Sequence, residues 1–166
     1  FMMSREENRK AEYVLKIAYD KGNKAERAEV NLYLMQLYEK QRLNKKVYNV
    51  ARNMFDKNLV KELNEVQVGE FEIYIKNLIV YHDEKINNVK KTKESYYTIT
   101  QLYKYLIQLG VPSESFFYYR LSLLNNLFKD NLYAWKYAVK ALETYNDKVK
   151  ELKKETLYEL VIGELN

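Results

Sequence analysis

The stretch that decides the fold is DNLYAWKYAVKALETYN, residues 130–146. Its small residues Ala134, Ala138 and Ala141 are four and three positions apart, so they share one face of a helix. Bulky side chains flank that face: Tyr133, Trp135, Tyr137, Val139 and Leu142. Small residues on a helix face let a second helix approach closely. The stretch therefore predicts a helix packed tightly against a neighbour.

The neighbour is the preceding segment, residues 115–129, whose apolar spacing is also helical. Only Lys129 and Asp130 connect the two segments. Helices joined by so short a link pack antiparallel, so residues 115–146 are predicted to form a helical hairpin.

This hairpin resembles a tetratricopeptide repeat (TPR), whose second helix typically reads Y-x-x-A-x-x-x-(aromatic)-x-x-A-L-E. Ala134 and the run 141–143 follow that pattern, whereas Ala138 stands where a large aromatic residue is usual. The first helix matches at the Trp, Leu and small-residue positions and departs at the Tyr position; these four residues are Tyr118, Leu121, Ser122 and Asn125. The resemblance covers about one unit well, and no proline closes that unit.

A second hairpin, residues 24–55, also resembles a TPR unit. Its residues at the packing positions are Leu34, Met35, Tyr38, Val47, Ala51 and Met54. Val47 and its equivalent Ala134 are 87 residues apart, which exceeds two TPR periods of about 34 residues. The unit between the two hairpins is therefore predicted to be longer than a standard repeat.

The whole chain is predicted to be all-α, a right-handed α-solenoid of about four helical hairpins in one domain, residues 1–166, or a fragment of a longer chain. The helices are expected at residues 4–20, 24–41, 45–55, 68–82, 90–109, 115–129, 130–146 and 148–165. Residues 59–66 fit either an extension of the third helix or a loop. Residues 83–88 are expected to be a polar link, broken at Asn87 and Asn88.

Several residues are predicted to begin or end helices. Ser4 with Glu7 forms a capping-box pattern, and Asn44 is a suitable N-cap. Gly22 and Gly110 are suited to the left-handed position after a helix. After Gly110, Pro112 and Ser113 mark the clearest break in the chain, with Ser113 the next N-cap.

Composition argues against catalysis, cofactors and metal sites. The chain has no cysteine, and its four glycines are too far apart to form a phosphate-binding loop. Its one histidine, His82, has Ile79 where a Glu-x-x-His pair needs a carboxylate, and we expect it simply to favour the negative end of a helix. The sequence thus predicts a protein that is not an enzyme.

The net charge of +5 leaves a nucleic-acid alternative open. Lys85, Lys90, Lys91 and Lys93, interleaved with Tyr96 and Tyr97, could contact phosphates and bases. Acidic residues such as Glu84 and Glu94 break the basic run, which is more typical of a solvated helix face. A protein or peptide partner is favoured over nucleic acid.

No apolar run is long enough to span a membrane, and the charged N-terminus lacks a signal core. We therefore expect a cytoplasmic protein, unless a targeting segment has been removed.

The TPR resemblance implies that the first helix of each hairpin lines a concave groove that receives a peptide or a partner helix. Carried over by register, the groove residues are Glu29, Leu32, Gln36, Glu39 and Lys40, then Glu72 and Lys76, then Phe116, Tyr119, Leu123, Asn126 and Leu127. Few of them are cations that could clamp a carboxylate, so an apolar or aromatic anchor fits better. Packing against a neighbouring repeat remains the alternative for Phe116, Tyr119 and Leu123.

The sequence thus favours a protein-interaction scaffold, with a peptide-sensing regulator fragment as the alternative. In the last predicted helix, Leu160, Val161 and Ile162 indicate either further repeats or a homodimer contact.

Overall fold

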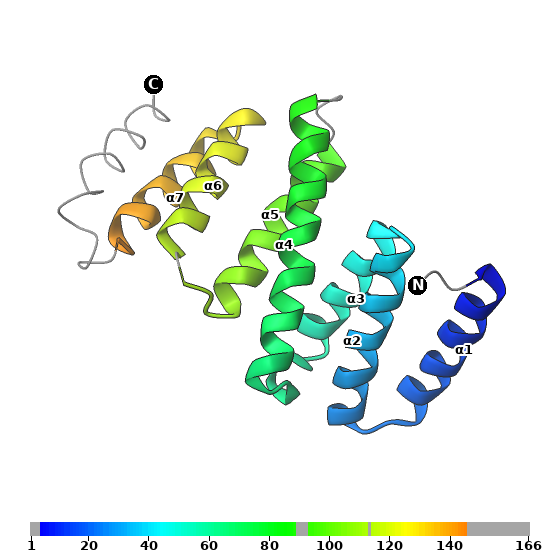
Figure 1. The fold of residues 1–166 in the computed structure, drawn as a ribbon. Helices are drawn as coiled ribbons and strands as arrows, with labels where there is room; N and C mark the ends of the chain where they lie inside the picture. Colours follow the sequence, from blue (N-terminus) through cyan, green and yellow to red (C-terminus); the bar gives the residue numbers. More distant parts are fainter. Residues whose placement is uncertain (1–3, 89–92, 113, 146–166) are drawn as a thin grey trace. The chain divides into compact units, whose positions relative to one another are not determined.

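The computed structural model describes residues 4–88, 93–112 and 114–145, and this part of the chain is mainly helical (Figure 1). Its seven α-helices are α1 Arg5–Lys21, α2 Lys24–Lys40, α3 Asn44–Asp56, α4 Glu65–Asn88, α5 Lys93–Gln108, α6 Glu114–Leu127 and α7 Asn131–Glu143. A short 3-10 helix, η1 Val60–Glu62, precedes α4. No strand occurs within these described ranges, which confirms the all-α prediction.

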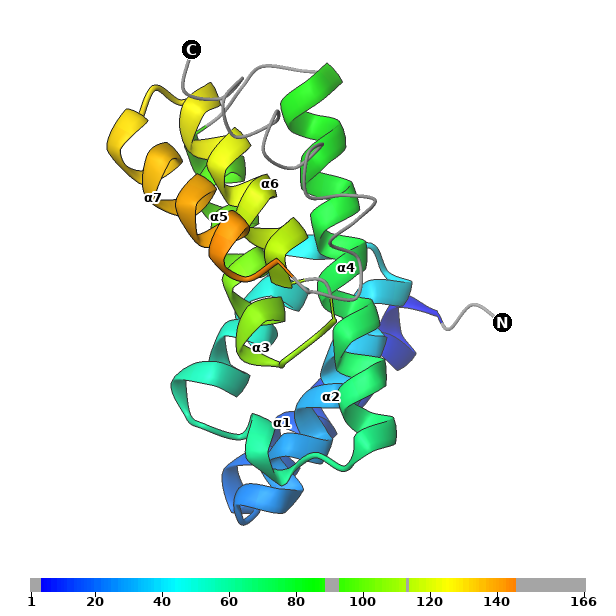
Figure 2. The same ribbon diagram turned by 90° about the vertical axis from the view of Figure 1, so that its left-hand side faces the viewer.

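The chain divides into two compact units, residues 1–78 and 79–166, and the division falls inside α4. In the first unit, α2 packs against both α1 and α3 (Figure 1). In the second unit, α6 packs against both α5 and α7, which the turned view also shows (Figure 2). Each unit thus has a central helix between two neighbours.

The hairpins α2–α3 and α6–α7 bury the side chains that the repeat pattern singles out. In the first hairpin the buried residues at these positions are Asn31, Leu34, Met35, Tyr38, Val47, Ala51 and Met54. In the second they are Tyr118, Leu121, Ser122, Asn125, Ala134, Ala138 and Ala141. Each residue of the second set follows its counterpart in the first by 87 positions. The two hairpins therefore pack in the same register.

The contact between α6 and α7 is the close approach that the alanine stripe predicts. Ser122, Ala138 and Ala141 are at most 1% exposed. The Ser122 hydroxyl donates a 2.9 Å hydrogen bond to the carbonyl oxygen of Ala134, on the facing helix. A hydroxyl that reaches the backbone of the opposite helix requires the small side chains around it.

Four helix ends share one turn geometry. After α5, Gly110 has φ of 71°, and the Val111 amide donates to the Leu106 carbonyl at 3.2 Å. The left-handed prediction for Gly110 is confirmed. The same conformation, with φ between 56° and 61° and the same type of hydrogen bond, is adopted by three residues that are not glycine: Arg42, Asn58 and Lys129.

The predicted starts and stops of the first helices are partly right. Ser4 and Glu7 form the expected capping box, with hydrogen bonds of 3.2 and 2.7 Å. Gly22 was predicted to be left-handed, and this is wrong, because its φ of −80° and ψ of 158° are extended. Asn44 is the first residue of α3, and Leu43 takes the N-cap position that was predicted for Asn44.

The middle of the chain differs more from the prediction. The predicted polar link at residues 83–88 is wrong, because α4 continues through Asn88. Residues 59–66 contain η1 and the start of α4, so they do not extend α3. The prediction of an eighth helix at 148–165, with its dimer contact, and the N-cap at Ser113 lie outside the described residues.

Replacing two glycines by alanine should change stability in opposite directions. A Cβ at Gly22 would lie 2.9 Å from the Ala18 carbonyl oxygen and 3.0 Å from the Glu26 Cβ, whereas nothing lies within 4 Å of a Cβ at Gly69. We expect Gly22→Ala to lower the free energy of unfolding by about 1–2 kcal/mol. Gly69→Ala, inside α4, should raise it by roughly 0.5–1 kcal/mol. Urea unfolding followed by circular dichroism checks both, and equal signs would contradict the close approach at Gly22.

Enlarging the alanine stripe should separate α6 from α7. Because Ala138 is 1% exposed, we expect Ala138→Leu to cost about 1–3 kcal/mol through overpacking. Ala25→Leu makes the same change at an exposed position of α2 and should alter stability by less than about 0.5 kcal/mol. Denaturant midpoints measure both variants. An Ala138→Leu protein as stable as the Ala25→Leu control would mean that α6 and α7 are not closely packed.

Candidate functional site

One surface strip of α6 carries the five residues predicted for that helix. Phe116 is 51% exposed and Leu127 is 37% exposed. Asn126 is exposed, and Tyr119 and Leu123 are half-buried. The rings of Phe116 and Tyr119 are neighbours, with their centres 6.5 Å apart. These five residues are called the α6 strip below.

A hollow of about 270 Å³ adjoins the α6 strip, inside the second unit. Its α6 wall contains Leu123, Asn126 and Leu127, as predicted, and also Arg120 and Leu124. The opposite wall contains Asp83 and Ile86, from the end of α4. The register of α6 could have identified Arg120, because it lies four residues after Phe116 and three before Leu123. Nothing local to the sequence indicated that Asp83 and Ile86 face this helix.

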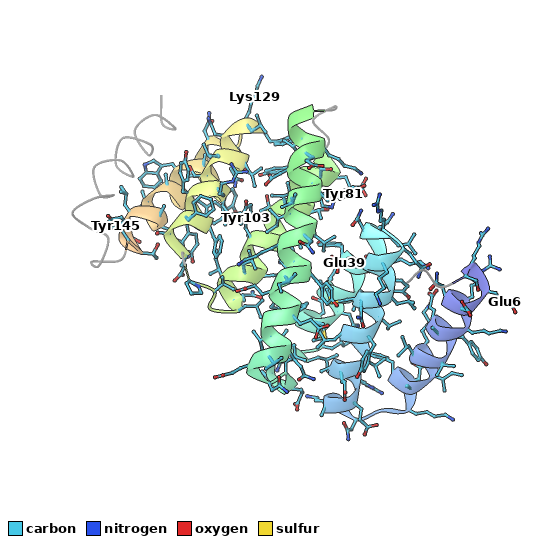
Figure 3. The ribbon with its side chains drawn as sticks, in the orientation of Figure 1. Glu6, Glu39, Tyr81, Tyr103, Lys129 and Tyr145 are labelled. Carbon is cyan, nitrogen blue, oxygen red and sulfur yellow. The ribbon has the colours of Figure 1, made fainter. Side chains whose placement is uncertain are left out.

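An ion pair between Arg120 and Asp83 lies on the wall of this hollow. Arg120 lies 3.1 Å from an Asp83 carboxylate oxygen and donates a 3.2 Å hydrogen bond to the Tyr103 hydroxyl of α5. Tyr103 is labelled in Figure 3. Burial raises the pKa of Asp83, and the Arg120 charge opposes part of that rise. Because both side chains are about one quarter exposed, the pair orients helices more than it stabilises them. Arg120 thereby ties α6 to α4 and to α5.

His82 has a structural position in the same unit. Its Nδ1 lies 3.3 Å from the Ser95 hydroxyl, across the gap between α4 and α5. The expectation that it sits at a helix end is wrong, because α4 continues to Asn88. Burial, with a smaller contribution from Lys85, lowers the pKa of His82 to about 4. At neutral pH it is therefore an uncharged packing residue.

The lowered pKa of His82 makes stability depend on pH. The unfolded chain takes up this proton near pH 6.5 and the folded chain only near pH 4. The contribution of His82 to the free energy of unfolding is therefore complete above pH 6.5 and is lost as the pH falls toward 4. Between pH 7 and 5 we expect the wild type to lose about 1–2 kcal/mol more than His82→Gln, which has no such proton. Unfolding in urea at both pH values measures this difference. Equal losses in the two proteins would show that His82 titrates alike in both states.

The predicted residues of α2 and of the first part of α4 are mostly polar, and Gln36 and Lys40 line a hollow beside α1. Glu29, Gln36 and Lys40 are exposed, whereas Leu32 is 4% exposed and lies in the core. Glu39 accepts a 2.6 Å hydrogen bond from the Asn77 side-chain amide of α4 (Figure 3). Lys76 and Glu72 form an ion pair at 3.3 Å within α4. These positions thus offer polar groups, in contrast to the α6 strip.

A second hollow, of about 460 Å³, lies among α1, α2 and α3 and was not predicted. The Tyr19 hydroxyl and the Asn31 side-chain amide both donate to the Asn53 side-chain oxygen, at 2.9 and 3.0 Å. These polar groups satisfy one another across three helices, so they stabilise the packing of the first unit.

Glu12 forms a charged group next to this second hollow. It accepts a 2.8 Å hydrogen bond from the Tyr38 hydroxyl and pairs with Lys16 at 2.8 Å. The hydrogen bond from Lys16, and to a lesser degree that from Tyr38, lowers the pKa of Glu12 to about 2. Glu12 is therefore ionised and fixed between α1 and α2.

The basic cluster considered for nucleic acid is only partly available for stacking on bases. Tyr96 is 7% exposed and stacks on Phe128 with ring centres 4.2 Å apart, so its faces are occupied. Lys85 lies over the Tyr81 ring at 4.5 Å, and Tyr97 is 64% exposed. Lys90 and Lys91 lie outside the described residues.

Among residues 4–88, 93–112 and 114–145, no three His, Asp or Glu side chains cluster as a metal site would require. No helix there is both long and apolar enough to cross a bilayer.

No family model, curated protein or solved structure matches this chain. Within the second unit, the α6 strip combines an exposed aromatic ring, Phe116, with three residues that line a hollow, and the Arg120–Asp83 pair lies on the wall of that hollow. The α6 strip is the candidate site.

Proposed function

We propose that this chain is a TPR-like α-solenoid that binds a protein partner and catalyses no reaction. In this proposal the α6 strip receives an apolar or aromatic side chain from an extended peptide or a partner helix. The observation that carries it is the α6 strip itself: Phe116, 51% exposed, neighbours Tyr119 at one end, and Leu123, Asn126 and Leu127 line a hollow of about 270 Å³ further along the same helix. Half-exposed aromatic residues next to a concavity are typical anchors of protein interfaces.

The repeated register supports the solenoid part of the proposal. Two hairpins bury equivalent positions 87 residues apart, as expected if each is one unit of a repeating array. In such an array the side chains between units are buried, and those on the first helix of each hairpin remain available to a ligand. α2 and α6 are those first helices.

The chemistry of the hollow indicates what kind of side chain would enter it. Leu123, Leu124, Leu127 and Ile86 supply apolar walls. Arg120 already pairs with Asp83, so it is not a ready clamp for a carboxylate. An aliphatic or aromatic side chain of the partner, flanked by groups able to hydrogen-bond to Asn126, fits this lining best.

The polar residues predicted in the first unit, taken by themselves, would contribute specificity rather than affinity to a contact made there. They are the exposed Glu29, Gln36 and Lys40 together with Glu39, Glu72 and Lys76. Hydrogen bonds to such groups fix register and reject ill-matched partners, while buried anchors supply most of the binding energy.

Replacing the two aromatic residues of the α6 strip tests the proposal. Extended peptides selected on the immobilised chain should bind Phe116→Ala and Tyr119→Ala at least about tenfold more weakly, because their anchor loses its apolar contact. Tyr133→Ala, which removes a 49% exposed ring of α7, is the matched control and should change Kd less than about twofold. Fluorescence anisotropy measures each Kd.

Two outcomes would contradict the proposal. If Phe116→Ala and Tyr119→Ala leave the peptide affinity unchanged, the peptides bind at a surface other than the α6 strip. A selection that yields no peptide above background would remove the proposed function itself.

A further inference from the structure

Part of the apolar surface of α1 is exposed, although α1 packs against α2. None of its side chains is fully buried, and Val14 is 62% exposed. Between this surface and α2 lies a hollow of about 490 Å³, in the first unit. We call it the α1–α2 seat, and its defining residues are Lys10, Val14, Leu15, Tyr33, Leu37 and Lys40. Apolar groups make up most of its surface, with a lysine from each helix.

The 87-residue register shows what occupies the equivalent place in the second unit. Tyr33, Leu37 and Lys40 correspond there to Arg120, Leu124 and Leu127 of α6, and α1 corresponds to α5. These residues of α6 face the end of α4, which belongs to the same unit. Arg120 pairs with Asp83, and Ile86 lines one hollow with Leu124 and Leu127. In the second unit the end of α4 takes this place, whereas no helix among the described residues of the first unit does so.

We propose that the α1–α2 seat binds an amphipathic helix of another protein. This helix lies parallel to α2, with apolar side chains against Val14 and Leu37 and carboxylates in its last turn near Lys10 and Lys40. The site is separate from the α6 strip, while Gln36 and Lys40, which line it, are also among the polar residues that the proposed function assigns to the first unit.

The direction of the bound helix follows from the antiparallel packing of α1 and α2. The Tyr38 hydroxyl bonds to Glu12, so the first half of α1 lies beside the last half of α2. Lys10 and Lys40 therefore lie at one end of the seat. In the second unit the equivalent end, at Leu127, faces Asp83 and Ile86, which are in the last two turns of α4. A helix bound in the same direction brings its C-terminus to the two lysines.

Electrostatics favours the same direction. The C-terminus of a helix carries a partial negative charge, and lysines beside it are stabilising. Among the described residues, no ion pair involves Lys40, and Lys10 pairs only with Glu6 one turn away on α1. That pair is solvent-exposed on both sides, so Lys10 can exchange it for a carboxylate of the partner at little cost.

The test uses two stapled helical peptides of identical composition. Both carry leucines at helical positions i, i+4 and i+7, and two glutamates are placed either in the last turn or in the first turn. Fluorescence anisotropy on the whole chain should give a Kd about tenfold lower for the peptide with glutamates in its last turn. Lys40→Glu should abolish this preference.

Variants separate the seat from other surfaces. Val14→Asp should weaken the preferred peptide at least about tenfold, because a carboxylate enters the apolar contact. Val66→Asp makes the same change at an 82% exposed position of α4 and should have no effect. Phe116→Ala should also have no effect, so failure of the α6 proposal and failure of this one are distinguishable. Thermal melts verify that each variant is folded.

Three outcomes would overturn the inference. The first is equal affinity for the two peptides, and the second is binding that Val14→Asp leaves intact. The third is a wild-type dimer in light scattering that Val14→Asp converts to monomer, since the seat would then belong to a second copy of this chain.

Discussion

The contact between α6 and α7 is the constraint on which the candidate site depends. Ser122 reaches the backbone of α7 at 2.9 Å, which is possible because Ala134, Ala138 and Ala141 leave room for α6. Once Leu121, Ser122 and Asn125 are fixed inward by this contact, helix geometry directs Phe116, Tyr119 and Leu123 to another face. The exposure of the α6 strip is thus a consequence of how closely its opposite side is packed.

The features that could be predicted from the sequence are local. The alanine stripe, the Ser4–Glu7 capping box and the turn at Gly110 each depend on residues within one or two turns of helix. The missed features depend on distant parts of the chain. Gly22 is needed where two helix ends approach, and Asp83 meets Arg120 across 37 positions. Leu32 was assigned to the groove by register, but neighbouring helices bury it.

Equivalent positions in the two units each form a hydrogen bond to the preceding helix. The residue at this position is the donor in the first unit and the acceptor in the second. In the first unit, Tyr38 of α2 donates to Glu12 of α1. In the second, its counterpart Asn125 accepts a 2.6 Å hydrogen bond from Tyr96 of α5. Burying a polar atom without a hydrogen-bond partner is costly. Each unit avoids that cost at this position with a different donor and acceptor pair.

The left-handed residues at two hairpin tips have a consequence for protein engineering. Arg42 and Lys129 adopt φ near 60°, a conformation that costs a side chain roughly 1–2 kcal/mol. Each also places a cation just beyond a helix C-terminus, where it recovers about 0.3–1 kcal/mol. Glycine at these positions would remove the conformational cost, and it would also remove the stabilising interaction of the cation with the helix C-terminus. By these figures glycine at either position would give a net stabilisation of roughly 0–1.7 kcal/mol.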